Sequence, residues 1–483
     1  MRGNDARPGH SAVLRRMPRT APAVRASIRK SAGRGTTIVL LILFWLIFYQ
    51  NLPGNFGLNA LPGAVLDGPA GQGAANWLDR TIKVAMIGIC LVIIASKWRQ
   101  TRALLKTLNP GLTAFMVLAP LSVLWSIDSS STLLRSVTLL TMVLVCFAVA
   151  VGGWSRERFQ LFAIPPIMYI LVASLVVGSL YPDRIIESGE DLSLKNAWHG
   201  VTHFKNQFGM IASIGIVFCF HHWLSGGRRV FWALAGIAAG SACLILSRSN
   251  TSQLATVVCV LFMVLVLRVP AVRQRYATHI VVGTVAVLLL YQMVVQQMIP
   301  GTSILLSPIA SLTGKDTTFS SRTMIWDIIK DHIRLAPLLG TGYGAYWTGV
   351  SKSTPSYVFE YLMFFYPTEA HNGYLDIVND LGLVGLACLL AFIFWFVKQA
   401  LQLMRIDRGQ ATLYLALLFQ QMIMNMSESE WYSRSNSSFV LILAATCLAR
   451  DLIQNSQPPA APQPVHGTQR PGRSRLRPAK RGA

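Results

Sequence analysis

The stretch 160–180, QLFAIPPIMYILVASLVVGSL, decides the fold class, because it contains no charged side chain over its whole length. A helix needs about 20 such residues to cross the hydrocarbon core of a bilayer. The whole chain of 483 residues is 53% hydrophobic and only 13% charged, and its mean hydropathy is +0.47. This composition lies outside the range of soluble globular proteins and indicates a membrane protein.

On both sides of 160–180, the sequence contains further apolar runs that are bounded by charged residues, Pro or Gly. They predict an all-α polytopic membrane protein with about 12 transmembrane helices. The runs are 37–52, 81–97, 110–127, 133–152, 160–180, 207–224, 229–247, 251–267, 278–298, 372–397, 410–426 and 436–449.

The 43 Lys and Arg residues alternate along the chain with these runs. Most of them fall in the two tails and in every second connection, which is the pattern of the positive-inside rule. We therefore expect an inner-membrane protein with both termini in the cytoplasm. The basic connections are Lys97–Lys106, Arg156–Arg158, Arg228–Arg229, Arg268–Arg275 and Lys398–Arg408.

The same alternation divides the chain into five parts. Residues 1–36 and 451–483 are predicted to be disordered basic cytoplasmic tails, since they have too little apolar surface to fold. Residues 37–298 would carry the first nine membrane helices and 371–450 the last three. The formal charge of +23 sits in tails and connections rather than on a folded basic patch, so we predict no nucleic-acid partner.

Residues 299–370 are then a long periplasmic loop, and loops of this length usually carry function. Within it, Arg322–Arg334 has the spacing of a short amphipathic helix whose apolar residues would lie on the membrane. The glycines of GTGYG, residues 340–344, permit close backbone approach, although a simple chain reversal also explains them.

Polar residues gather in the predicted periplasmic segments. Lys205 and Asn206 open an apolar run and could meet an anionic substrate, or Lys205 could simply reach the lipid headgroups. Arg248 lies in the short turn SRSNT, where a guanidinium suits phosphate oxygens. Glu428, taken alone, resembles an ordinary solvated helix end.

The segment Thr368–Gly385, TEAHNGYLDIVNDLGLVG, is the most informative. With Thr368 as helix cap, His371 would lie in the first turn, where free N–H groups favour an anion and a histidine can act as a general base. Asp376 and Asp380 would face protein or water rather than lipid, and they could equally be structural pairing groups. No metal-ligand spacing, nucleophile elbow or dinucleotide motif is present, so we predict no metal and no cofactor.

Taken in order, these motifs resemble the O-antigen ligase and polymerase superfamily. The resemblance extends from about Trp125 to Glu430, and its WHGVTHFKN segment (198–206) is closest to the exopolysaccharide polymerase branch. It rests on WS (125–126), FKNQFG (204–209), SRSNT (247–251), Arg322 with Trp326 before GTGYG (340–344), HNGYLDIVNDLGLVG (371–385) and Glu428.

The resemblance implies a metal-independent, inverting transfer of glycan from an undecaprenyl diphosphate donor to an acceptor hydroxyl. The acceptor would be a glycan repeat unit in a polymerase or lipid A core in a ligase, with membrane lipids and chain-length or export proteins as partners. His371 and Arg322 would be catalytic, and Arg248, Lys205 and Arg322 would bind the diphosphate. The supporting residues would be Asn206, Asn372, Tyr374 and Glu428.

A transporter or flippase of lipid-linked sugars is the competing hypothesis from another class. Such a protein should contain two related halves with matched broken helices near the middle of the membrane. The sequence has no detectable repeat of this kind, and its polar clusters gather on one predicted face.

Overall fold

The computed structural model describes residues 34–50, 72–152, 156–187, 196–226, 230–296, 320–348, 355–362, 366–433 and 435–455. Across these ranges the chain is helical, and its sole β-type pairing is an isolated bridge between Ile186 and Trp198. The all-α prediction is therefore confirmed. The predicted tails lie outside the described residues, apart from their inner ends, 34–36 and 451–455, which are helical.

Each predicted apolar run coincides with one helix. The helices are α2 (Arg34–Gln50), α3 (Gln72–Ser96), α5 (Pro110–Leu121), α6 (Ser129–Val151), α7 (Arg156–Leu180), α8 (Lys205–Leu224), α9 (Val230–Leu246), α10 (Asn250–Arg268), α11 (Ala277–Val295), α15 (Gly373–Met404), α16 (Arg408–Met424) and α17 (Asn436–Asn455). Between them lie the short helices α4 (Trp98–Leu105), α13 (Ser320–Ile333) and α14 (Val358–Leu362).

Among the described residues, seven helices are long and apolar enough to cross a membrane, or eight if α3 and α4 form one span bent by 95°. Three more apolar helices are shorter, namely 35–49, 110–124 and 230–246. A polytopic membrane protein is thus confirmed, while the number of twelve spans stays a prediction.

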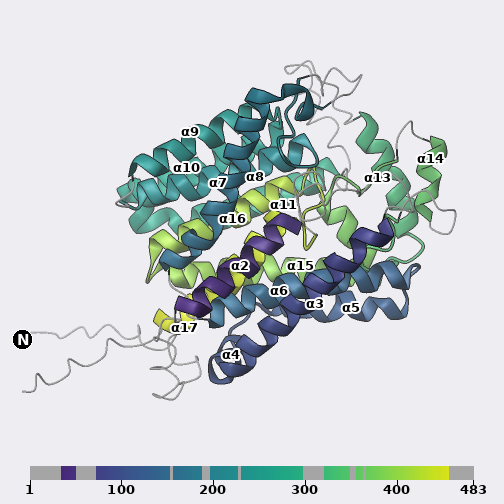
Figure 1. Cartoon of the computed structure of the whole chain (residues 1–483), viewed down its shortest axis with the longest axis horizontal. Helices are drawn as coiled ribbons and strands as arrows, with labels where there is room; N and C mark the ends of the chain where they lie inside the picture. The colour runs from purple at the N-terminus through teal and green to yellow at the C-terminus, as the bar shows by residue number, and fades with distance from the viewer. Residues whose placement is uncertain are drawn as a thin grey trace, which may run out of the picture.

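The helices pack in two groups around a buried centre (Figure 1). On one side α7, α8, α9 and α10 pack together, and on the other α2, α3, α5 and α6 pack with α15 and α17. The apolar window of α17 is 100% buried, whereas that of α11 is only 17% buried. Lipid is the natural solvent for the exposed apolar surface of α11, since so large an apolar surface is unfavourable in water.

The connections sort into two ends of the bundle, as the charge alternation predicts. At the end predicted to be cytoplasmic, His221 Nε2 lies 2.9 Å from Gly409 O and Arg268 donates to Leu224 O at 3.0 Å. At the opposite end, Trp198 N donates to Leu246 O at 2.9 Å. Which end faces the periplasm stays a prediction.

Helix α15 is broken at Gly382, where φ is +64°. The loop at 337–344 docks into this break: Gly342 N donates to Asp380 O at 2.9 Å, and Leu383 N donates to Pro337 O at 2.9 Å. A Cβ on Gly382 would lie 2.2 Å from Leu338 backbone atoms, so only glycine allows the approach. The GTGYG glycines therefore serve helix–loop packing at one end of the bundle.

The amphipathic helix predicted for Arg322–Arg334 is present as α13. The prediction that its apolar face lies on the membrane is wrong. Ile325 and Ile329 are fully buried in a small core with Tyr346 and Phe359 of the same long loop. The loop supplies enough aromatic surface of its own to bury this face, which a helical pattern alone cannot reveal.

Candidate functional site

His371 lies just before α15 rather than in its first turn. Asn372 caps the helix, because its side chain accepts from Leu375 N at 3.1 Å, and the helix starts at Gly373. The prediction that Thr368 is the cap is therefore wrong. His371 itself has a φ of +50°, a left-handed conformation that non-glycine residues rarely adopt and that is often found at functional sites.

A tight loop after α16 holds this segment in place. Asn425 Oδ1 accepts from the backbone N–H groups of Glu430 and Trp431 at 2.8 and 2.7 Å. Gly373 N donates to the carbonyls of Asn425 and Glu428, both at 3.0 Å. A Cβ at Gly373 would lie 1.9 Å from Asn425 Oδ1. The His-Asn-Gly order therefore lets the two segments meet directly.

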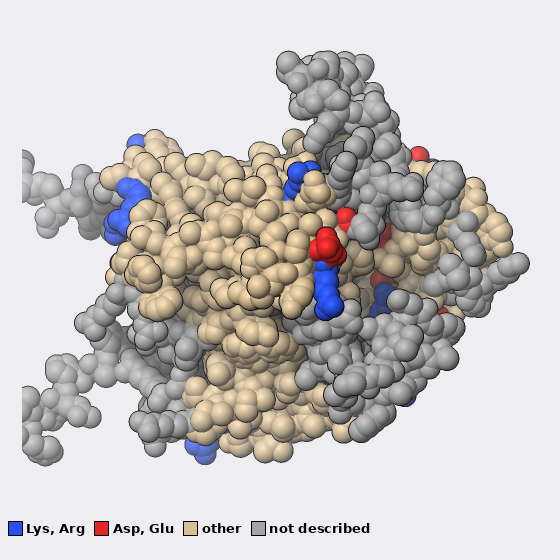
Figure 2. All heavy atoms as spheres, turned by 45° about the horizontal axis from the view of Figure 1, so that its top comes forward, with Lys and Arg blue, Asp and Glu red and all other residues tan. Residues whose placement is uncertain are grey.

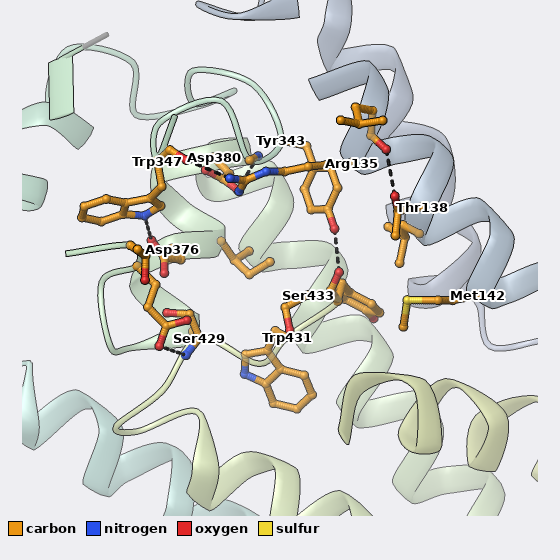
Figure 3. A pocket seen from close by; sticks show the side chains of 18 of the residues that line it. Arg135, Thr138, Met142, Tyr343, Trp347, Asp376, Asp380, Ser429, Trp431 and Ser433 are labelled. Atoms are coloured by element: carbon orange, nitrogen blue, oxygen red, sulfur yellow. Dashed lines mark hydrogen bonds between the residues drawn. The ribbon is translucent and has the colours of Figure 1, made fainter. Parts of the chain in front are cut away.

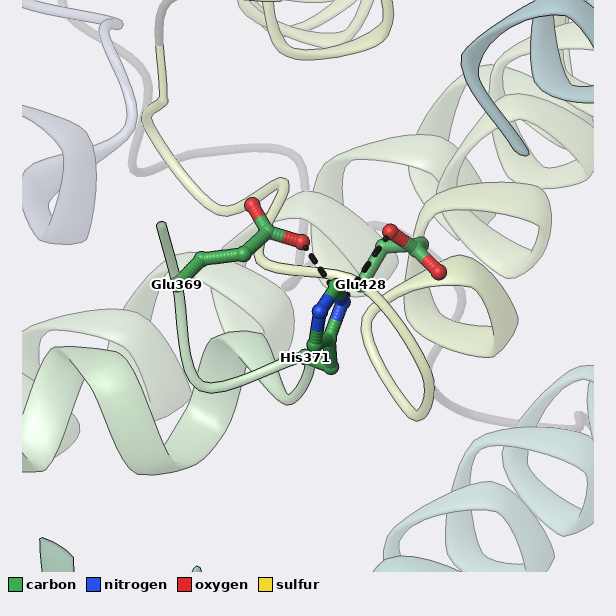
Figure 4. A group of neighbouring side chains, drawn as sticks. All are labelled: Glu369, His371 and Glu428. Carbon is green, nitrogen blue, oxygen red and sulfur yellow. Dashed lines mark ion pairs between the residues drawn. The ribbon is translucent and has the colours of Figure 1, made fainter. Parts of the chain in front are cut away.

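The contact between these segments brings two carboxylates to His371 (Figure 4). His371 Nδ1 lies 3.2 Å from Glu369 Oε1 and 3.5 Å from Glu428 Oε2. Neither pair of atoms meets the geometry of a hydrogen bond, so both contacts are ion pairs. All three side chains are largely buried, at 27%, 28% and 12% exposed respectively.

Glu428 is the centre of the cluster. Its Oε1 accepts from Asn206 Nδ2 at 2.7 Å and from Arg322 at 3.3 Å, so α8 and α13 both reach it. Figure 2 shows Lys and Arg side chains close to Asp and Glu on one surface of the molecule. The structure thus joins Asn206, Arg322, His371 and Glu428, which are far apart in the sequence. The expectation that Glu428 is a solvated helix end is wrong.

The charges of the cluster shift one another's pKa values. Burial acts to lower the pKa of His371, but Glu369 and Glu428 outweigh it and raise this pKa to about 10. Burial together with the charge of Glu428 raises the pKa of Glu369, although His371 opposes the change. Burial also acts upward on Glu428, yet His371 and Arg322 hold its pKa below the ordinary value. At neutral pH His371 is therefore an imidazolium beside an ionised Glu428.

Glu369, His371 and Glu428 place one ligand-type atom each within 4.8 Å of one another, a spacing that a divalent metal could use. The surrounding charges favour an ion-pair network instead. Arg322 already lies against Glu428, and a metal would have to displace the proton of His371 in order to bind there.

Three other residues of the predicted site, Asn372, Tyr374 and Lys205, make contacts outside the His371–Glu428 cluster. Asn372 is fully buried and accepts from Gln292 as well as capping α15. Tyr374 points into the core, where its hydroxyl lies 3.4 Å from Met422 O and its ring packs on Trp431. The backbone N–H of Lys205 donates to Glu187 at 2.6 Å. These contacts hold α8 and α15 at this end of the bundle, and the functional roles of the three residues stay predictions.

Arg248 has a φ of +50° and an exposed side chain at the start of α10. Its turn lies close to Glu428, because the hydroxyl groups of Thr251 and Ser427 are 2.9 Å apart. Arg248 thus lies at the same end of the bundle as His371.

The sequence interpretation missed Glu369 and the part played by Trp326. A single Glu two residues before a histidine forms no recognisable motif, so no signal could have identified it. Trp326 donates from its indole to Ala370 O at 2.9 Å, and Asp376 accepts from Ala370 N at 3.0 Å. Both contacts fix the residue that precedes His371.

The fold and the cluster define a polytopic membrane protein with a buried Arg–Glu–His–Glu network at one end of its helical bundle. Residues 235–390 match the O-antigen ligase family. The chain is also 28% identical over 321 residues to the exopolysaccharide production protein ExoQ of Rhizobium meliloti (strain 1021), a match that covers 63% of this chain and 69% of that protein. Both findings support the O-antigen ligase and polymerase family, with an ExoQ-like character, as the motifs predicted.

The family match contains Arg248, Arg322 and His371 but ends before Glu428. The two comparisons together support a polymerase or ligase function in polysaccharide biosynthesis.

Proposed function

We propose that this protein is a periplasmic-face glycosyltransferase that polymerises repeat units of an exopolysaccharide or O-antigen. It would transfer glycan from an undecaprenyl diphosphate carrier to an acceptor hydroxyl, without a metal and with inversion at the sugar carbon. The observation that carries this proposal is the Arg322–Glu428–His371–Glu369 network at one end of the bundle. The similarity to ExoQ, an exopolysaccharide production protein, supports an exopolysaccharide as the product rather than a glycan on lipid A core.

The cationic groups would serve the leaving group. When the bond between the sugar carbon and the diphosphate oxygen breaks, negative charge grows on the diphosphate. Arg322, Arg248 and Lys205 would stabilise that charge through preorganised electrostatic attraction. In the described part of the chain, Nε2 of His371 has no protein partner, so the imidazolium could also donate to a diphosphate oxygen.

Glu369 would take the proton of the acceptor hydroxyl. His371 is protonated at neutral pH, which leaves it unable to act as the first base. Glu369 has a raised pKa and lines a cavity, and a carboxylate with such a pKa is suited to general-base catalysis. The acceptor oxygen forms the new bond to the sugar carbon, its proton moves to Glu369, and the lipid diphosphate departs.

His371→Ala tests the proposal in cells that lack the chromosomal gene. We expect no polymer and an accumulation of single lipid-linked repeat units, with normal amounts of protein in the membrane. His279→Ala is the matched control, because His279 is exposed on α11 outside the cluster, and it should restore polymer. Normal polymer from His371→Ala would refute the assignment, and an accumulation of long unligated chains would indicate a ligase.

A further inference from the structure

A cavity of about 430 Å³ lies next to the cluster of Glu369, His371 and Glu428, between α3, α6, the start of α15 and the loop at 429–433 (Figure 3). Its volume is within the range of small-molecule sites. Glu369 and Asp376 both belong to its lining. An acceptor hydroxyl that enters the cavity needs Glu369 in a fixed place, because a general base must lie within hydrogen-bond reach of the proton that it takes.

Ala370, the residue between Glu369 and His371, is held at both of its backbone polar groups. Its N–H donates to Asp376 Oδ2 at 3.0 Å, and its carbonyl accepts from Trp326 Nε1 at 2.9 Å. Ala370 is fully buried, so water does not compete for these hydrogen bonds. The two peptide groups that join Ala370 to Glu369 and to His371 are therefore both anchored.

Asp376 is in turn oriented by the long loop. Its other oxygen, Oδ1, accepts from Trp347 Nε1 at 2.8 Å, as Figure 3 shows. Its backbone N–H donates to Asn372 O at 3.0 Å in the first turn of α15. Because the two carboxylate oxygens hold different partners, the side chain cannot turn without breaking a hydrogen bond.

The two tryptophans belong to one buried core. Trp326, Trp347 and Ala370 all pack in the small core of the long loop, where the ring of Trp347 stacks on Phe359 with centroids 5.3 Å apart. Two indole N–H groups therefore point from this core to one segment, that of Trp326 directly and that of Trp347 through Asp376. A close-packed core is a firm support for such contacts.

The backbone of Trp347 is also fixed. Arg135 of α6, another residue of the cavity lining, donates from its guanidinium to Trp347 O at 2.8 Å. Arg135 lies against Gly344, where φ is +66° and a Cβ would lie 2.2 Å from Arg135 Cδ. The support of Asp376 thus extends from the loop to the membrane helix α6.

The segment that bears Glu369 and His371 needs this support. The φ of +50° at His371 is unfavourable for a residue with a side chain and persists only where the surroundings impose it. Glu428 repels Glu369 while His371 attracts it. Anchored peptide groups on both sides of Ala370 oppose both the relaxation of this φ and the retreat of Glu369.

We propose that Asp376, oriented by Trp347, is a positioning residue that holds Glu369 against His371 through the backbone of Ala370. Trp326 holds the same residue from the other side. The proposal rests on the proposed function, in which Glu369 is the base, and it identifies a residue that sets the distance from the base to the imidazolium.

The test measures the pKa of His371 by nuclear magnetic resonance of isotope-labelled histidines in the full-length protein, held in phosphatidylcholine nanodiscs. The signal is assigned by its loss in His371→Gln. Asp376→Asn has one acceptor oxygen, so it can hold Trp347 or Ala370 but not both. If Glu369 Oε1 then retreats by about 1 Å from its distance of 3.2 Å, the proton affinity of His371 falls about tenfold at an effective dielectric constant of about 20.

Trp347→Phe separates position from charge, because it removes a hydrogen bond of Asp376 and leaves every charge in place. We expect it to lower the proton affinity of His371 in the same direction, by about threefold, since about half of the support of Asp376 is lost. Ile329→Val is the matched control. It removes one methylene group from the same buried core without removing a hydrogen bond, and it should leave the pKa of His371 unchanged.

An unchanged pKa in both Asp376→Asn and Trp347→Phe would overturn the proposal. A fall in Asp376→Asn alone would also overturn it, because that result shows a direct effect of the lost charge. An equal fall in Ile329→Val would indicate general loosening of the core and would overturn it as well. Should Asp376→Asn not fold, Trp347→Phe against Ile329→Val decides. The measurement needs neither donor nor acceptor, so its failure is distinguishable from that of the His371→Ala experiment, which tests the proposed function.

Discussion

The Glu369→Gln variant tests two proposals at once: that Glu369 is the general base, and that its charge helps to raise the pKa of His371. Glu369 Oε1 lies 3.2 Å from His371 Nδ1. At an effective dielectric constant of about 20, this attraction is worth about 5 kcal/mol before the cost of burying both groups is subtracted. It is one of the two attractions that hold the pKa of His371 at about 10 against burial, the other being that of Glu428. Glutamine keeps the shape of the side chain and removes the charge.

We expect two changes in the pH profile of glycan transfer by the purified protein with a lipid-linked donor. The wild-type rate should rise with pH as Glu369 loses its proton and fall near pH 10 as His371 loses its own. Glu369→Gln should lower the rate by about 10²–10⁴-fold, the usual contribution of a general base. Its alkaline limb should move to lower pH, since the pKa of His371 falls when one carboxylate is removed.

Glu187→Gln is a suitable control, because Glu187 is a carboxylate at the same end of the bundle that contacts the backbone of Lys205 instead of His371. Its alkaline limb should stay where it is in the wild-type protein. A Glu369→Gln protein with the wild-type rate would show that Glu369 is not the base. An unmoved alkaline limb would show that His371 does not depend on Glu369 for its charge.

Three further predictions follow from the same contacts. Arg322→Lys should lower kcat about 100-fold, because lysine lacks the planar fork that can hold Glu428 and a phosphate together; an unchanged kcat would contradict this. Gly344→Ala should lower the free energy of unfolding by about 1–2 kcal/mol, measured by thermal unfolding, because φ is +66° there; unchanged stability would show that the loop adapts. The stability advantage of the wild-type protein over His371→Gln should be full below pH 6.5 and vanish as the pH rises through 10, since folding raises this pKa; an advantage that does not vary with pH would contradict the pKa.

The helices could be predicted from the sequence because residues that face lipid or other helices are apolar. A hydropathy profile detects such runs of apolar residues directly. The start of α15 could not be predicted in this way. Thr368 has the chemistry of a helix cap, but Gly373 N donates to the carbonyls of Asn425 and Glu428, and this contact moves the start of the helix to Asn372. A contact between residues so far apart in the sequence leaves no local pattern. The same reason explains why Glu428 resembled a solvated helix end.

The residues of the cavity were also beyond the reach of sequence patterns. Arg135 lies within the apolar run 133–152, where a single arginine is ordinarily interpreted as a side chain that reaches the lipid headgroups. Its position against Gly344 depends on where the loop at 337–344 docks, and that depends on the break at Gly382. The glycines were visible in the sequence, but their partners were not.

Helix α15 links the two parts of the proposed active centre. Asn372 caps it beside His371, Asp376 holds Trp347 and the backbone of Ala370, and Asp380 accepts from Gly344 N at 2.7 Å. One face of the cavity and the segment bearing His371 are therefore built on the same short stretch of helix, just before its break at Gly382. A displacement of that stretch would therefore move the lining of the cavity and the segment bearing His371 together.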